Sequence, residues 1–236
     1  QQSSRTSQPL TGLANQLHNG DMSALASSVN SFFQQVAADL SPLSIDPPPP
    51  PSVFPFEFVI SKAAVERKLM QIKIHKAPGP DNLPNWVLRD FCMQLSGPVC
   101  AIFHASIREG FVPARWKEAN VIPVPKVQPP KSVESDLRPI SLTATLGKLL
   151  ESFVGGWILG RIVDKLDDHQ YGGLKRRSTT HALVDMLHHW HKGQSARVVF
   201  IDFAKAFDHV DHNILVAKLL AYDLPDIIIR WMMSFL

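Results

Sequence analysis

The most informative segment for the fold lies late in the 236-residue chain and reads Val198-Val199-Phe200-Ile201-Asp202-Phe203-Ala204-Lys205-Ala206-Phe207-Asp208. It opens on a short continuous apolar run, which is typical of a strand buried on both faces of a sheet. We therefore predict a strand over residues 196–203, with Asp202 near its carboxyl end. A carboxylate at that place is costly to bury unless it binds a metal ion or a cation.

Asp202 is a candidate metal ligand, because sheet enzymes place catalytic groups at the carboxyl ends of strands. Two-metal phosphoryl-transfer enzymes use carboxylates to hold two divalent ions, and Mg²⁺ prefers such oxygen ligands. Asp208 follows in the same segment. It is either a second ligand or the cap of the turn into the next helix, and the spacing leaves both open.

Outward from this stretch, the pattern predicts an α/β chain of the α+β kind, with more helix than strand. Residues 116–127 predict an edge strand, because prolines are tolerated there, and residues 137–143 predict a second short strand or a turn. The loop Lys76-Ala77-Pro78-Gly79-Pro80-Asp81 cannot continue a helix. Helices are predicted from Ser61, over about residues 84–109 with an interruption near Gly97-Pro98, over 146–166, 179–190 and 211–222, and from Pro225 onward.

The leading part of the chain predicts a connector. Residues 1–20 are polar and are expected to be disordered or loosely attached. Asp21 is a suitable cap for a helix that runs to about Leu40. Residues 41–55 contain the proline run Pro47 to Pro51 and predict an extended polyproline II linker. The alternative is a ligand for a proline-binding module.

Composition narrows the function classes. A formal charge of +3, from 24 basic and 21 acidic residues, means that any phosphate-binding surface is local. The two cysteines, Cys92 and Cys100, make neither a zinc cluster nor a disulfide framework, so an intracellular compartment is expected. Nothing in the pattern distinguishes nucleus from cytoplasm. No apolar run is long enough to predict a membrane span or a membrane partner.

The two ends of the chain suggest a piece of a longer protein. The sequence opens on Gln1 and closes on the apolar segment Trp231-Met232-Met233-Ser234-Phe235-Leu236. We expect this closing segment to lack its packing partner.

A histidine-rich segment is the second polar constellation. Asp185, His188, His189 and His191 lie on or near one predicted helix, and Asp185 and His189 share a face. No cysteine stands nearby, so a polar helix face is favoured over a zinc site.

Five segments in order resemble reverse transcriptases of non-LTR (LINE-type) retrotransposons. Residues 200–208, with Val210, resemble motif A of that family, and residues 76–81 resemble the loop that opens its fingers. Residues 116–126 and 137–142 resemble its two fingers strands. Gln170-Tyr171-Gly172, with Arg177-Ser178-Thr179, resembles the element before the palm, although Gly173 stands where the family usually has an aromatic residue. Asn30-Ser31-Phe32-Phe33 resembles the preceding connector.

The resemblance implies a role for each matching residue. Asp202 would bind Mg²⁺, helped by the backbone carbonyl of Phe203. Phe207 would lie under the incoming sugar and exclude a 2′-hydroxyl; the alternative is a core residue. Lys126 and Arg138 would reach the triphosphate, or else are solvated surface residues. Gln170 and Tyr171 would lie near the template or the nucleotide. The run Lys175, Arg176 and Arg177 would contact nucleic acid; the alternative is a solvated entry to the following helix.

The resemblance also implies a partial right-hand polymerase fold. Residues 1–60 would be the connector, 61–195 the fingers, and 196–236 the first palm strand with its helix. The implied activity is that of a nucleotidyltransferase, an RNA-directed DNA polymerase that uses an RNA template, a DNA primer, dNTPs and Mg²⁺. No Asp-Asp pair follows Asp202, so we expect the chain itself to be inactive. The alternatives are a non-catalytic nucleic-acid-binding remnant and a protein-interaction scaffold, and the oligomeric state stays open.

Overall fold

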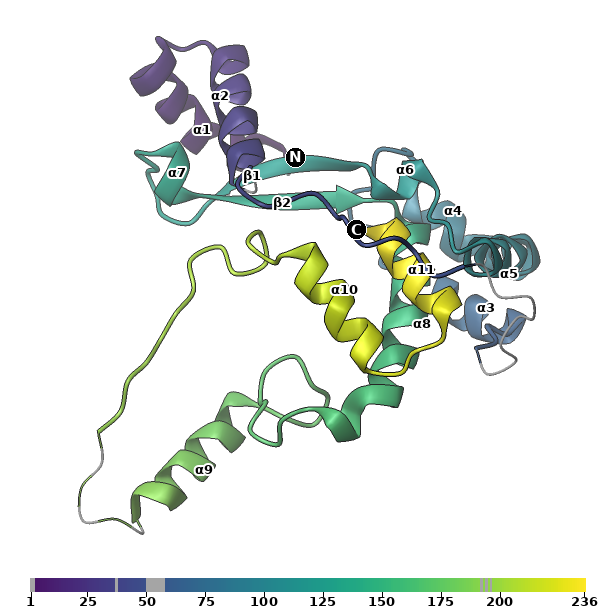
Figure 1. The fold of residues 1–236 in the computed structure, drawn as a ribbon. Helices are drawn as coiled ribbons and strands as arrows, with labels where there is room; N and C mark the ends of the chain where they lie inside the picture. Colours follow the sequence, from purple (N-terminus) through teal and green to yellow (C-terminus); the bar gives the residue numbers. More distant parts are fainter. Residues whose placement is uncertain (1–2, 37, 50–57, 192, 194, 196) are drawn as a thin grey trace.

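The computed structural model describes residues 3–36, 38–49, 58–191, 193, 195 and 197–236 (Figure 1). It is rich in helix and contains a small two-stranded sheet, which agrees with the predicted α+β class. The elements are α1 (Ser3–His18), α2 (Met22–Gln35), α3 (Lys62–Met70), α4 (Asn85–Asp90), α5 (Cys92–Glu109), α6 (Ala114–Lys117), β1 (Ala119–Pro125), α7 (Val133–Asp136), β2 (Leu137–Thr143), α8 (Thr145–Ile162), η1 (Val163–Lys165), α9 (Thr179–His191), α10 (His212–Ala221) and α11 (Asp226–Phe235).

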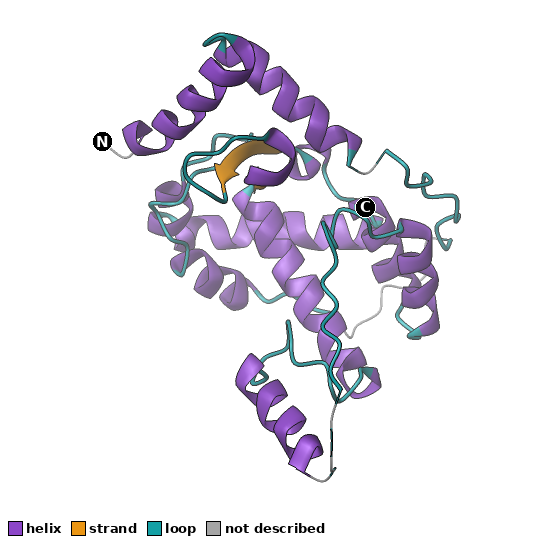
Figure 2. Ribbon diagram, turned by 90° about the vertical axis from the view of Figure 1, so that its left-hand side faces the viewer, coloured by secondary structure: helices purple, strands orange, loops and turns teal. Residues whose placement is uncertain are grey.

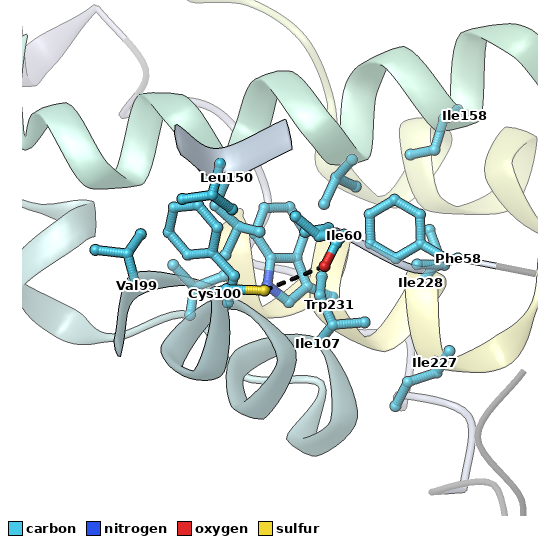
Figure 3. Close-up of a cluster of buried hydrophobic side chains, with 14 of the residues drawn as sticks. Phe58, Ile60, Val99, Cys100, Ile107, Leu150, Ile158, Ile227, Ile228 and Trp231 are labelled. Atoms are coloured by element: carbon cyan, nitrogen blue, oxygen red, sulfur yellow. Dashed lines mark hydrogen bonds between the residues drawn. The ribbon is translucent and has the colours of Figure 1, made fainter. Parts of the chain in front are cut away.

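The main hydrophobic core joins α3, α5, α8, α10 and α11. Trp231 of α11 is fully buried in it, and Figure 3 shows the indole among Val99, Leu150 and Ile228. The expectation that the closing apolar segment lacks a partner was wrong, because α11 packs on α5. Each large apolar side chain buried in this way contributes roughly 1.5–3 kcal/mol to stability.

The two strands form an antiparallel hairpin that runs from the pair Ala119 and Thr143 to the pair Pro125 and Leu137. The prediction of β2 is confirmed, and β1 is shorter than predicted because Trp116 belongs to α6. Pro123 lies opposite Pro139. Since neither has an amide hydrogen, this pair must be one whose backbone groups point away from the partner strand. Both outer edges are therefore interrupted by proline, which hinders pairing with a further strand.

The helices α4 and α5 occupy the range in which one interrupted helix was predicted. The break lies at Phe91, whose ψ of 24° leaves the helical range, and Pro98 is accommodated inside α5. The predicted interruption near Gly97-Pro98 was therefore wrong. Burial of Val99, Cys100 and Phe103 on the following turns compensates for the backbone hydrogen bond that Pro98 cannot donate.

The loop over residues 76–81 packs tightly against the start of α8. A Cβ on Gly79 would lie 2.5 Å from the backbone of Ala144, so only glycine fits there. Buried Asn85 braces the same loop, since it donates to the Lys76 carbonyl and accepts from the Thr145 hydroxyl. This loop therefore fixes the junction between the hairpin and α8.

A second, smaller core lies where α1 and α2 pack on α7 and β2, and Figure 2 shows these two helices on one side of the strands. The prediction that residues 1–20 are disordered was wrong for residues 3–18, which form α1. Leu13 and Ala14 are fully buried against α2, and this burial outweighs the polar composition. The predicted cap of α2 is confirmed, because Asp21 accepts hydrogen bonds from two backbone amides of its first turn.

Residues 41–49 contain neither helix nor strand, which agrees with the predicted extended linker, and residues 50–55 of that prediction lie outside the described residues. The segment is docked rather than free. Ser44 donates twice to the side-chain oxygen of Asn213 on α10, and Arg230 on α11 donates to the Pro48 carbonyl. Residues 41–49 therefore strap the N-terminal helices to the main core.

The strand predicted over residues 196–203 was wrong. Residue 196 lies outside the described residues, and residues 197–203 have no regular structure. Val199 and Phe200 are each 82% exposed, and Figure 1 shows this segment running well apart from the hairpin. A strand needs a neighbour for its backbone groups, and within the described ranges the ladder of β1 and β2 lies elsewhere.

Candidate nucleotide pocket

A pocket of about 800 Å³ lies where α2, the hairpin and the turn before α10 meet. The turn, residues 204–209, leads into the capping residue Asp211 of α10. The lining residues are Phe32, Phe33, Val36, Val121, Lys126, Glu134, Leu137, Arg138, Pro139, Ile140, Ser141, Lys205, Phe207 and Asp208. The pocket thus combines an apolar wall with charged groups at the end of the hairpin.

Three residues predicted to touch the nucleotide meet in this pocket: Lys126, Arg138 and Phe207. Phe207 is 94% exposed, so the alternative that it is a core residue is wrong in this structure. Its ring is free for contact with a ligand.

Lys126 and Arg138 differ in how they are held. Lys126 Nζ donates to the Ser135 carbonyl oxygen at 2.8 Å. The side chain of Arg138 is exposed and has no hydrogen bond or ion pair with the residues that the structure describes. Arginine can bind an anion bidentately, while lysine acts as a point charge. Both cations are therefore accessible to an anionic ligand.

Phe32, Glu134 and Lys205 are among the pocket residues that sequence reasoning missed. Lys205 Nζ lies 4.2 Å from the centroid of the Phe32 ring. The pKa of Glu134 is lowered, first by the hydrogen bond from Ser132, then by its own backbone amide, and also by the charge of Lys205. The neighbouring aromatic residues Phe32 and Phe33 of the connector could have indicated a binding surface, but nothing in the sequence predicted that they lie beside the turn over residues 204–209.

The predicted metal ligands lie outside the pocket. Asp202 and Phe203 belong to the exposed segment 197–203, whereas Asp208 lines the pocket. Across the described parts of the chain, no group of three His, Cys, Asp or Glu side chains could hold a metal ion. Asp202 with its present neighbours therefore does not fit a two-metal centre.

The element around Gln170 and Tyr171 forms a separate loop beside α9, far from the hairpin in Figure 1. Arg177 Nη1 donates to three backbone carbonyl oxygens of this loop, at 3.2 Å to Asp167, 2.5 Å to Asp168 and 3.0 Å to Gln170. Its guanidinium is thus engaged in folding the loop. Gly173 has a φ of 76°, a conformation that disfavours an aromatic residue at this place.

The same loop rests on the polar face of α9. The pKa of the Tyr171 phenol is raised, first by desolvation and then by a hydrogen bond with Asp185. His189 Nδ1 lies 2.9 Å from the Asp185 carbonyl oxygen, and His169 Nε2 lies 3.9 Å from the Asp185 carboxylate. Lys175 and Arg176 of the predicted nucleic-acid contact are exposed on this loop.

None of the described helices is long and apolar enough to cross a membrane.

Comparison with known proteins finds similar sequences. Residues 124–236 match the family described as reverse transcriptase (RNA-dependent DNA polymerase). The chain is 29% identical over 156 residues to the "Probable RNA-directed DNA polymerase from transposon BS" of Drosophila melanogaster. The aligned residues cover 64% of this chain and 17% of that protein.

Two further relatives are RNA-directed DNA polymerases from the mobile element jockey. The Drosophila melanogaster protein is 28% identical over 176 residues, which is 70% of this chain and 19% of the relative. The Drosophila funebris protein is 31% identical over 161 residues, which is 65% of this chain and 18% of the relative. The chain thus spans less than a fifth of the length of these relatives. By this match and these relatives, the chain is similar to reverse transcriptases of non-LTR, LINE-type mobile elements, and residues 124–236 carry the match to that family.

Proposed function

We propose that this chain supplies the nucleotide-binding part of an RNA-directed DNA polymerase. The observation that supports this most is the meeting of Lys126, Arg138 and Phe207 in one pocket. In this proposal the chain comprises a connector, fingers and the start of a palm, with boundaries near residues 60 and 195. The ligand is a deoxynucleoside triphosphate, paired to an RNA template and added to a DNA primer.

Lys126 and Arg138 bind the triphosphate in this proposal. Lys126 exchanges a neutral carbonyl partner for an anion, which attracts the ammonium more strongly because it carries the opposite charge. Phe207 lies under the sugar, where its rigid ring leaves neither space nor a partner for a 2′-hydroxyl. Gln170, Tyr171, Lys175 and Arg176 lie on the α9 loop and contact the template strand, while Arg177 keeps that loop folded.

Asp202 is proposed as one ligand of a divalent cation, with the Phe203 carbonyl beside it. The family's chemistry uses divalent ions to stabilise charge on the reacting phosphate. A single carboxylate in an exposed segment is not a complete site, and the chain has no Asp-Asp pair after Asp202. We therefore propose that the 236-residue chain by itself does not synthesise DNA.

The test compares a fluorescent deoxynucleoside triphosphate with the matching ribonucleoside triphosphate in equilibrium titrations. We expect tighter binding of the deoxynucleotide, and we expect Phe207→Ala to reduce that preference while both ligands still bind. Equal affinity for the two sugars in the unchanged protein would contradict the role of Phe207. Templated primer extension by this chain would contradict the claim that it is inactive.

A further inference from the structure

Lys205 is a third cation of the pocket and comes from a different part of the chain than Lys126 and Arg138. Its ammonium lies over the ring of Phe32, with 4.2 Å between Nζ and the ring centroid. Within the part of the chain that the structure describes, Lys205 forms no ion pair with a carboxylate. The negative face of the aromatic ring holds the ammonium, while Glu134 in the same pocket feels the charge of Lys205 without forming an ion pair with it.

The backbone at Lys205 is strained. Its φ is 50°, in the left-handed region that side chains other than glycine, asparagine and aspartate rarely adopt. The amides of Asp208 and His209 donate to the Lys205 carbonyl oxygen at 2.9 and 3.2 Å and close the turn. Strained residues persist only where the surroundings hold them, and they cluster at ligand-binding sites. The same turn carries Phe207, so it orients two pocket residues together.

The helix that presents Phe32 is held on two sides. Phe32 and Phe33 pack against the small core formed with Val133 and Leu137 of the hairpin region. Residues 41–49 lie beyond α2 in the chain and form hydrogen bonds with Asn213 at the start of α10. Because the Lys205 turn leads into α10, the strap ties the Phe32 wall to the element that carries Lys205.

We propose that Lys205 binds the phosphates of the incoming nucleotide and that Phe32 positions its ammonium for this contact. The inference rests on the proposed nucleotide-binding function. A neutral ring holds the ammonium without cancelling its charge, so the pocket stays attractive to an anion. A carboxylate paired directly with Lys205 would compete with the phosphate, whereas Glu134 lines the pocket without forming an ion pair with Lys205.

The experiment measures affinity for a fluorescent deoxynucleoside triphosphate and for inorganic tripolyphosphate as a competitor. Lys205→Met should weaken both by about tenfold, the size of one charge-assisted contact. Lys205→Arg, which keeps the charge and the contact with the ring, should restore binding to within about twofold. Phe32→Leu should weaken binding by about two- to fivefold, the size of a cation–π contact. Lys218→Met and Phe91→Leu, exposed and outside the pocket, are the matched controls.

A second measurement separates positioning from general damage. In Phe32→Leu without nucleotide, acetylation of Lys205 followed by mass spectrometry should be faster than in the unchanged protein, with unaltered acetylation of Lys218. Equal rates at Lys205 would overturn the positioning role of Phe32. If Lys205→Met binds the nucleotide within twofold of the unchanged protein, the phosphate role of Lys205 is overturned, while the proposed function is not. No binding by the unchanged protein would overturn the proposed function and the phosphate role together.

Discussion

The indole nitrogen of Trp231 donates a 2.9 Å hydrogen bond to the hydroxyl oxygen of Ser106, and this contact joins α11 to α5 inside the main core. Ser106 in turn donates to the Phe111 carbonyl oxygen at 2.5 Å. The two bonds connect the last helix to the turn after α5. They make α11 an integral part of the core.

Trp231→Phe should lower the free energy of unfolding by about 1–3 kcal/mol, because it removes a buried hydrogen bond and part of a fully buried ring. Urea denaturation at 25 °C measures this change. In a double-mutant cycle with Ser106→Ala, the coupling should be about 1 kcal/mol. Additive effects of the two substitutions would contradict the contact.

Asn213→Ala should release the strap formed by residues 41–49. The substitution removes the acceptor of two hydrogen bonds from Ser44 and the donor to the Pro42 carbonyl oxygen. Hydrogen exchange at the Ser44 amide should become several-fold faster. Asn213→Asp keeps the acceptor and suits a helix N-terminus, so it should retain protection at Ser44. Equal exchange in Asn213→Ala and the unchanged protein would show that the strap does not depend on Asn213.

Arg177→Lys should loosen the loop beside α9 although the charge is kept. All three hydrogen bonds come from Arg177 Nη1, and a lysine side chain is one atom shorter, so its ammonium does not reach the same place between the carbonyl oxygens. Chymotrypsin cleavage after Tyr171 should become several-fold faster. Arg176→Lys, at an exposed position of the same loop, is the control and should leave the rate unchanged. The same slow cleavage in Arg177→Lys would contradict the role of Arg177 in folding the loop.

The loop at the end of the hairpin should be sensitive to acid through Asp136. Hydrogen bonds from the Lys131 amide, then the Ser135 hydroxyl and the Ser132 amide, hold the pKa of this carboxyl below its usual value, with a further contribution from Lys126. A depressed pKa means that the carboxylate stabilises the folded loop above the unfolded value of about 3.9 and that this stabilisation is lost as pH falls through the folded pKa. An NMR titration of the Asp136 carboxyl should give a midpoint below the pKa of a free aspartate, which is about 3.9. A midpoint at or above it would contradict these hydrogen bonds.

Local signals in the sequence predicted local structure well. Asp21 and Asp211 cap the helices that their positions indicated, and β2 spans the residues predicted as a short strand or turn because it pairs with β1 along its whole length. The run Val198 to Ile201 failed for a non-local reason, since an apolar run becomes a strand only if another strand pairs with it. The helix α1 was missed because its polar composition hides the buried positions Leu13 and Ala14.

The sequence predicted only those residues of the candidate site that lie in segments resembling the family. Lys126, Arg138 and Phe207 meet as the resemblance implied. The contact between Phe32 and Lys205 could not be predicted, because it depends on how the connector helix docks on the hairpin. Asp202 retains its proposed role, but its exposed position shows that the motif does not by itself assemble a metal centre.

Lys126 and Arg138 are proposed to bind a nucleotide in the pocket, and an equilibrium titration with a fluorescent deoxynucleoside triphosphate measures this binding. We predict saturable binding that weakens by about tenfold for each substitution, Lys126→Gln and Arg138→Gln, because each removes one charge-assisted contact. Lys218→Gln, which removes the same charge outside the pocket, should bind as tightly as the unchanged protein. Equal affinity in the pocket variants and the Lys218→Gln control, or no saturable binding by the unchanged protein, would contradict the account.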